Sequence, residues 1–143
     1  RFFTTSGDLG RSWTEPEVLR YEDGEQVLCP ASLAHVLSST KTGRFYLITN
    51  ILAEPTWGCR PRFTLQIAEI DVDTLRLRRD SVAVIDTNDP SGPPTTDFSN
   101  WRWYEDRETG DIVLVMTGCP GDRGRSEDCG VPPHSYRYEI CFE

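Results

Sequence analysis

The sequence lacks the runs and leaders on which several protein classes depend. No apolar stretch approaches the roughly 18 to 20 uncharged residues that a membrane helix needs. The opening Arg1-Phe2-Phe3-Thr4 is neither a signal peptide nor an initiator methionine, so we expect the 143 residues to be a segment of a longer polypeptide. With 37% hydrophobic and 27% charged residues, the composition is that of a core-forming water-soluble domain, which argues against disorder.

Positive charge is scarce. Fifteen basic residues stand against 23 acidic ones, and the net charge of −8 opposes binding to phosphate backbones and anionic membranes. We therefore expect neither a nucleic acid nor a membrane as a partner. Lys41 is the single lysine, and the other cations are all arginine. Arginine suits bidentate recognition of carboxylates, although a compositional bias of the genome explains the same count.

Metal-ligating patterns are also missing. The chain has two histidines and no CxxC pair, so we expect no metal site and no cofactor. The five cysteines are Cys29, Cys59, Cys119, Cys129 and Cys141. Cys119 and Cys129 bracket a loop rich in glycine and proline, and a disulfide between them would indicate an extracellular or periplasmic protein. Free thiols in a reducing compartment fit the sequence equally well.

Helical periodicity is almost absent, because the apolar residues come in short runs broken by Gly, Pro, Asn and Asp. Short strands without helical spacers predict an all-β fold built from antiparallel meanders. The predicted strands are Phe2–Thr5, Trp13–Leu19, Ala31–Leu37, Arg44–Leu52, Phe63–Ile70, Leu75–Asp86, Phe98–Glu105, Asp111–Thr117 and Tyr136–Phe142.

One strand pattern occurs twice. The stretch Lys41–Ile48 aligns with Glu108–Val115 at an offset of 67 residues, and both are a tight Thr-Gly turn that leads into a strand. In each copy the order is a strand, a short turn, a second strand, a long loop and a third strand. A repeat of a few strands every few tens of residues is typical of β-propeller blades, although 67 residues is a long blade with long loops.

The first segment contains a short motif, Ser6-Gly7-Asp8-Leu9-Gly10-Arg11-Ser12-Trp13. It fits the pattern Ser/Thr-x-Asp-x-Gly-x-x-Trp of the Asp box at Ser6, Asp8, Gly10 and Trp13. An Asp side chain accepts hydrogen bonds from its own turn, Gly adopts positive φ, and Trp is expected to bury its ring between strands. On this motif the chain resembles the sialidase (neuraminidase) superfamily of Asp-box (BNR-repeat) β-propellers.

The resemblance implies a propeller fragment of about two to three antiparallel four-stranded blades from the C-terminal part of a six-bladed parent. Residues 1–28 would end one blade and carry the Asp box. Residues 29–87 would form a complete blade, and residues 88–143 three strands of a further one. The partners of this segment would include the remaining blades of the same polypeptide.

Loop lengths place the expected site away from the Asp box. Meandering blades alternate their connections between two faces, and the long loops all fall on the face opposite the short turns and Asp8. Asp8 and Trp13 are therefore expected to be structural. The candidate residues on the long-loop face are Trp57, Cys59, Arg60, Arg62, Asp97, Asn100, Arg102, Asp122, Arg123, Arg125, His134 and Tyr136.

Arginines beside aromatic and acidic residues suit a pocket for an acidic sugar, such as sialic acid. We expect Arg62 and Arg102 to converge on the carboxylate, with Asp97 and Trp57 nearby. The alternative is that these arginines form salt bridges that hold the loops together.

Sialidases are similar to one another in using three arginines, a tyrosine nucleophile assisted by a glutamate, and an aspartic acid. Their tyrosine opens an inner strand as Tyr-Ser, and the counterpart here is Phe98-Ser99, which cannot act as a nucleophile. The resemblance therefore predicts a sialidase-like glycoside hydrolase or a glycan-binding propeller. The alternatives are a non-catalytic Asp-box propeller that binds carbohydrate or protein, and a five-bladed glycosidase with paired carboxylates.

Overall fold

The computed structural model describes residues 1–88, 96–117, 119–120 and 135–142. Their regular elements are strands, apart from one short 3₁₀ helix, and the sheets are antiparallel, so the predicted all-β class is confirmed. The elements are β1 (Phe2–Phe3), β2 (Glu17–Val18), β3 (His35–Ser38), β4 (Phe45–Thr49), β5 (Thr64–Asp71), β6 (Arg76–Leu77), η1 (Arg79–Ser81), β7 (Ala83–Thr87), β8 (Thr96–Asp97), β9 (Arg102–Glu105), β10 (Ile112–Thr117), β11 (Cys119–Pro120) and β12 (Ser135–Ile140).

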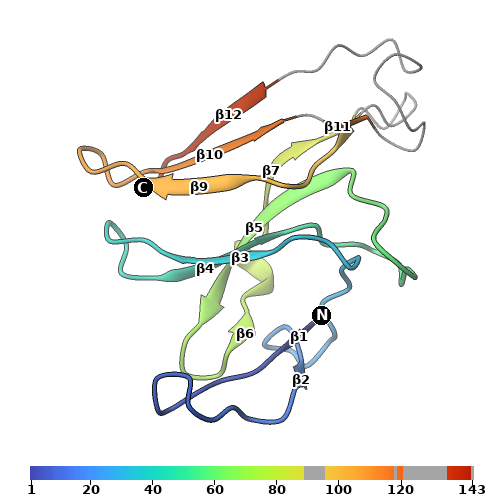
Figure 1. Ribbon diagram of the computed structural model, residues 1–143, viewed down its shortest axis with the longest axis vertical. Helices are drawn as coiled ribbons and strands as arrows, with labels where there is room; N and C mark the ends of the chain where they lie inside the picture. Colours follow the sequence, from blue (N-terminus) through green and yellow to red (C-terminus); the bar gives the residue numbers. More distant parts are fainter. Residues whose placement is uncertain (89–95, 118, 121–134, 143) are drawn as a thin grey trace.

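The main sheets lie on one another as layers (Figure 1). The central layer has the order β3-β4-β5-β6, and β7 pairs with β5 beside β6. One neighbouring layer is the sheet β12-β10-β9, and the other is the two-stranded sheet β1-β2. Within the described residues, no helix is long and apolar enough to cross a membrane.

The internal repeat is a repeat of structure. In the hairpin β3–β4 His35 pairs with Ile48, and in the hairpin β9–β10 Arg102 pairs with Val115, so both partners are displaced by 67 residues. The turns match as well, because the amide of Gly43 donates to the carbonyl of Ser39 and that of Gly110 to Asp106, at 2.9 Å in both. The two glycines adopt φ of 69° and 71°, a region that disfavours other residues. Residues 35–48 and 102–115 are therefore equivalent hairpins.

The predicted strand Leu75–Asp86 is wrong as a single element. The helix η1 separates β6 from β7, and both of these strands pair with β5. Between β6 and β7 the backbone amide of Glu69 on β5 has a side-chain partner in place of a backbone one. It donates to the Ser81 hydroxyl at 2.8 Å. The same hydroxyl donates to the Arg78 carbonyl at 2.7 Å, which closes the helical turn. Local side-chain bonds of this kind compete with a regular ladder.

Three other strands begin four residues later than predicted. The strand β2 begins at Glu17 rather than Trp13, and β3 begins at His35 rather than Ala31. The strand β9 begins at Arg102 rather than Phe98, because Asn100 adopts a φ of 58° that breaks the extended chain. Phe98 therefore follows the separate strand β8 and does not open an inner strand.

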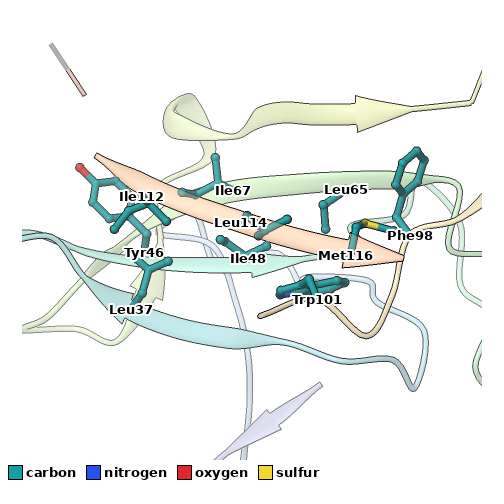
Figure 2. Close-up of a cluster of buried hydrophobic side chains, with 10 residues drawn as sticks. All are labelled: Leu37, Tyr46, Ile48, Leu65, Ile67, Phe98, Trp101, Ile112, Leu114 and Met116. Atoms are coloured by element: carbon teal, nitrogen blue, oxygen red, sulfur yellow. The ribbon is translucent and has the colours of Figure 1, made fainter. Parts of the chain in front are cut away.

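Apolar side chains fill both faces of the central sheet. On one face, side chains of β3, β4 and β5 pack against Trp101 and the strand β10 (Figure 2). The buried members of this cluster are Leu37, Tyr46, Ile48, Leu65, Ile67, Phe98, Trp101, Ile112, Leu114 and Met116. On the other face, Leu47, Ala68 and Leu77 pack against residues of the first segment. These two clusters fix the order of the layers.

The Asp8 turn has the hydrogen bonding that its sequence predicts. One carboxylate oxygen of Asp8 accepts from the amides of Arg11 and Ser12 at 3.0 and 2.9 Å, and the other accepts from the Ser12 hydroxyl at 2.7 Å. The expected burial of Trp13 is wrong, because its side chain is 63% exposed. Its ring lies over Gly10, and the sheet beside it has only the two strands β1 and β2 among the described residues.

Acid should weaken this turn. The hydrogen bonds from Ser12 lower the pKa of Asp8 from 3.8 to about 2. A lowered pKa in the folded state means that the contribution of Asp8 to stability is complete above about pH 4 and is lost as the pH falls toward 2. NMR titration should show the Ser12 amide shifting with a midpoint near 2. In Asp8→Asn this transition should be absent, and a midpoint at the ordinary Asp value in the parent protein would contradict the expectation.

Candidate functional site

The connections of the hairpins divide between two ends of the layers. The short turns that follow β3 and β9 lie at the left of Figure 1, and the segment that joins β1 to β2 turns back at that end too. The long connection from β4 to β5 lies at the right, at the end of the layers where β11 is also found. The candidate residues 60, 62, 97 and 102 adjoin strand ends on this long-loop side, which we call the long-loop edge.

At the long-loop edge two arginines meet one carboxylate. An Nη2 atom of Arg60 lies 2.8 Å from Oδ2 of Asp97, and the Nη2 atom of Arg62 lies 3.1 Å from the same oxygen. Arg62 also donates from Nη1 to the Ser99 hydroxyl at 3.0 Å. The Asp97 side chain is fully buried, while those of Arg62 and Arg60 are 18% and 38% exposed. The arginines therefore shield the carboxylate and face solvent to different degrees.

Backbone contacts position this cluster. The amide of Phe98 donates to the carbonyl of Arg62 at 2.8 Å, which ties the start of β5 to the segment after β8. The buried side-chain amide of Asn50 donates to the carbonyls of Thr64 and Phe98 at 2.8 and 3.2 Å. The Ser32 hydroxyl donates to the other end of that amide at 2.9 Å. Asn50 thus links three segments through one side chain.

Arg1 extends the network to the first segment. Its Nη2 atom donates to the carbonyl of Ser32 at 3.0 Å and lies 3.3 Å from the hydroxyl of Thr49. Arg1, Arg60 and Arg62 are thus joined by a chain of hydrogen bonds that contains a single described carboxylate, that of Asp97. Among the described residues, this network therefore joins three guanidinium groups to one carboxylate.

Two polar atoms of the cluster have no partner among the described residues. They are Oδ1 of Asp97 and Nε of Arg62, both buried. A buried polar atom without a partner costs free energy, and such atoms are rare. Neither atom is exposed to solvent, and the part of the cluster that faces solvent is the more exposed Arg60.

Arg102 and Trp57 do not contact this cluster directly in any described interaction. The Nη1 atom of Arg102 donates to the carbonyl of Trp101 at 3.0 Å, and the ring of Trp101 meets His35 edge-on with centroids 6.1 Å apart. Burial, and then the charge of Arg102, lowers the pKa of His35, which favours its neutral form. Trp57 is fully exposed. The structure thus brings Arg62 to Asp97, sets Arg102 beside His35 and leaves Trp57 in solvent.

No tyrosine replaces Phe98 in its position. Phe98 is buried in the core and 3% exposed. Tyr104 is half exposed on β9, and Tyr136 stacks on Tyr138 within β12. The hydroxyl of Tyr138 donates to Asp86 at 2.5 Å, and burial together with this bond raises the pKa of Tyr138, which disfavours its phenolate. These contacts are structural.

Several predicted residues lie outside the described part of the chain, namely Asp122, Arg123, Arg125, His134 and Cys129. The disulfide considered between Cys119 and Cys129 lies outside it as well, because Cys129 is not among the described residues. The described cysteines Cys29, Cys59 and Cys141 are free thiols. Among the described residues, no group of three or more His, Cys, Asp or Glu side chains is arranged to hold a metal ion.

Sequence reasoning missed Asn50, Ser32 and Ser99. Asn50 directly follows the apolar run of β4. A polar residue at the end of an apolar strand is a detectable sign of a side chain that forms hydrogen bonds there. Ser32 and Ser99 carry no such sign, because their roles depend on contacts with residues 18 and 37 positions away.

Comparison of the chain with protein-family models, with curated proteins and with solved structures gives no match in any of the three.

Proposed function

We propose that the protein is part of a sialidase-like β-propeller that binds an acidic glycan at the long-loop edge. The observation that carries the proposal is the cluster of Arg60 and Arg62 on the buried Asp97. Guanidinium groups held in a fixed orientation are suited to the carboxylate of a sugar acid. The equivalent hairpins and the Asp8 turn support the propeller architecture, since both features are expected of stacked blades.

In this proposal the three residues have different tasks. Arg60 is the most exposed of them and contributes the charge that the ligand carboxylate meets. Asp97 is fully buried and holds both guanidinium groups in place. Arg62 is mainly buried and positions Asp97 and Ser99.

Binding without hydrolysis is the second candidate function. The observation that favours it is the Phe98 side chain, which the sequence pattern matches to the tyrosine and which is packed in the core. A propeller of this kind would present carbohydrate or protein ligands without cleaving them. Release of a fluorescent alcohol from a sialoside by the protein would contradict this second function and support a hydrolase.

Calorimetric titration with sialic acid tests the first proposal. Arg60→Gln should weaken binding about tenfold or more, because a charged bidentate contact contributes roughly 1.5 to 3 kcal/mol. The matched control is Arg44→Gln, since Arg44 is paired with Glu69 at the short-turn end. Binding of a neutral sugar should not change in either variant. Equal affinities of Arg60→Gln and the parent protein for sialic acid would remove the proposal.

A further inference from the structure

The two equivalent hairpins carry basic side chains at one matched position. His35 is the first residue of β3 and Arg102 is the first residue of β9. Each pairs with a residue of the following strand, His35 with Ile48 and Arg102 with Val115. Because the layers that contain the two hairpins lie on one another (Figure 1), both positions come to the long-loop edge.

An aromatic contact joins the two layers at this position. The ring of His35 meets the ring of Trp101 edge-on, with centroids 6.1 Å apart. Trp101 directly precedes β9 and is fully buried, whereas His35 is half-buried. The Nδ1 atom of His35 and the Nε1 atom of Trp101 are both buried and have no hydrogen-bond partner among the described residues. At these two atoms the contact between the layers therefore depends on packing alone.

This environment suits the neutral imidazole and disfavours the charged one. A protonated imidazole has an N–H group at both nitrogens, and the one at Nδ1 would be buried without an acceptor among the described residues. Burial, and then the charge of Arg102, lowers the pKa of His35 below 6.5. The neighbouring strands β4 and β10 contain no charged residue. The titratable side chain of β4, Tyr46, has its hydroxyl 3.2 Å from that of Thr42, in the short turn.

At their other ends the two hairpins are joined by polar contacts that resist mild acid. The Nζ atom of Lys41 lies 2.9 Å from Oδ1 of Asp111, and the amide of Thr40 donates to the carboxylate of Glu105 at 2.6 Å. Carboxyl groups titrate near pH 4, about two pH units below histidine. The bond from Lys41 lowers the pKa of Asp111 further. Protonation of His35 therefore acts on one end of the hairpin pair and leaves the other end joined.

We propose that the two hairpins form a hinge operated by protonation of His35. In mild acid β3 separates from Trp101 and β9 at the long-loop edge, while the short turns stay in contact. An opened His35 reaches water and takes up a proton at its ordinary pKa, whereas the closed contact lowers that pKa. The open form therefore gains population as the pH falls below about 6.5, until the closed form is protonated too. This inference does not depend on the binding of a glycan.

NMR measurements between about pH 7.5 and 5.5 test the hinge. The exchange of the buried indole N–H of Trp101 with solvent reports opening, and the fully exposed Trp57 is an internal reference. The protection of Trp101 relative to Trp57 should fall at least about twofold over this range, since opening is coupled to the uptake of one proton. The chemical shift of the Trp101 indole N–H should titrate with the same midpoint as the ring C–H signals of His35, below 6.5.

Two substitutions assign the effect to this contact. His35→Phe keeps an aromatic ring against Trp101 and cannot take up a proton, so its protection of Trp101 should not fall. The other histidine, His134, is unchanged in this variant, so the difference from the parent protein belongs to His35. Arg102→Gln should raise the pKa of His35 toward 6.5. The matched control is Arg107→Gln, which removes the same charge from the exposed turn of the same hairpin and should leave this pKa unchanged.

Three results would overturn the proposal. The first is a protection of Trp101 in the parent protein that stays constant over the pH range. The second is an equal fall of that protection in His35→Phe. The third is a parallel loss of protection at the amides of Gly43 and Gly110, which bond within the short turns. In that case mild acid unfolds both hairpins as a whole and does not open one end.

Discussion

Replacement of Arg62 by methionine should lower the free energy of unfolding by about 3 kcal/mol, because it leaves the fully buried carboxylate of Asp97 with one arginine in place of two. Methionine retains most of the side-chain volume, so the loss reports the charge and its hydrogen bonds. Urea denaturation followed by tryptophan fluorescence measures the change.

The control for this prediction is Arg60→Met. Arg60 contacts the same oxygen of Asp97 but is twice as exposed as Arg62, so its removal should cost about 1 kcal/mol or less. The double variant Arg62→Met, Asp97→Leu should regain much of the stability lost in Arg62→Met, because no buried charge remains unpaired. Equal losses in Arg60→Met and Arg62→Met would show that burial does not determine the strength of these contacts.

Replacement of Trp101 by alanine should cost about 3 to 5 kcal/mol. Trp101 is fully buried in the cluster of side chains drawn in Figure 2, to which β3, β4, β5 and β10 contribute. The substitution leaves a cavity at the junction of two layers. Thermal and urea unfolding should both show the loss.

The chain contains its own control for Trp101. Trp57 is fully exposed, and Trp57→Ala should change the free energy of unfolding by no more than about 0.5 kcal/mol. Trp101→Phe should cost less than Trp101→Ala, because it keeps an aromatic ring and removes the indole N–H, which has no partner among the described residues. Similar stabilities of Trp101→Ala and Trp57→Ala would contradict the described packing of the layers.

The sequence predicts the all-β class and the repeat because both depend on local patterns. The Thr-Gly turns before Arg44 and Asp111 require positive φ at the glycine, and the alternation of apolar residues fixes the strands that follow. The division of Leu75–Asp86 into two strands is not visible in this way. It depends on a bond between Ser81 and Glu69, twelve residues apart, and no local pattern encodes that contact.

The candidate site was also predictable in part, because loop lengths are a local feature of the sequence. Loop lengths place Arg62 and Asp97 at one end of the sheets, and the structure joins their side chains. They do not reveal that Asn50 and Ser99 complete the network, nor that Trp57 points into solvent. Side-chain direction within a loop is determined by long-range contacts, and these are absent from a single sequence.

The most direct test of the proposed glycan site is an NMR titration of the protein with sialic acid. The account predicts that the amide signals of Arg60, Arg62 and residues 97–102 shift, and that those of the turns 39–43 and 106–110 do not. The methyl ester of the same sugar, which lacks the negative charge, should produce smaller shifts at the same residues. Shifts confined to the short turns, or equal shifts with the acid and its ester, would contradict the assignment of the long-loop edge as a site for acidic sugars.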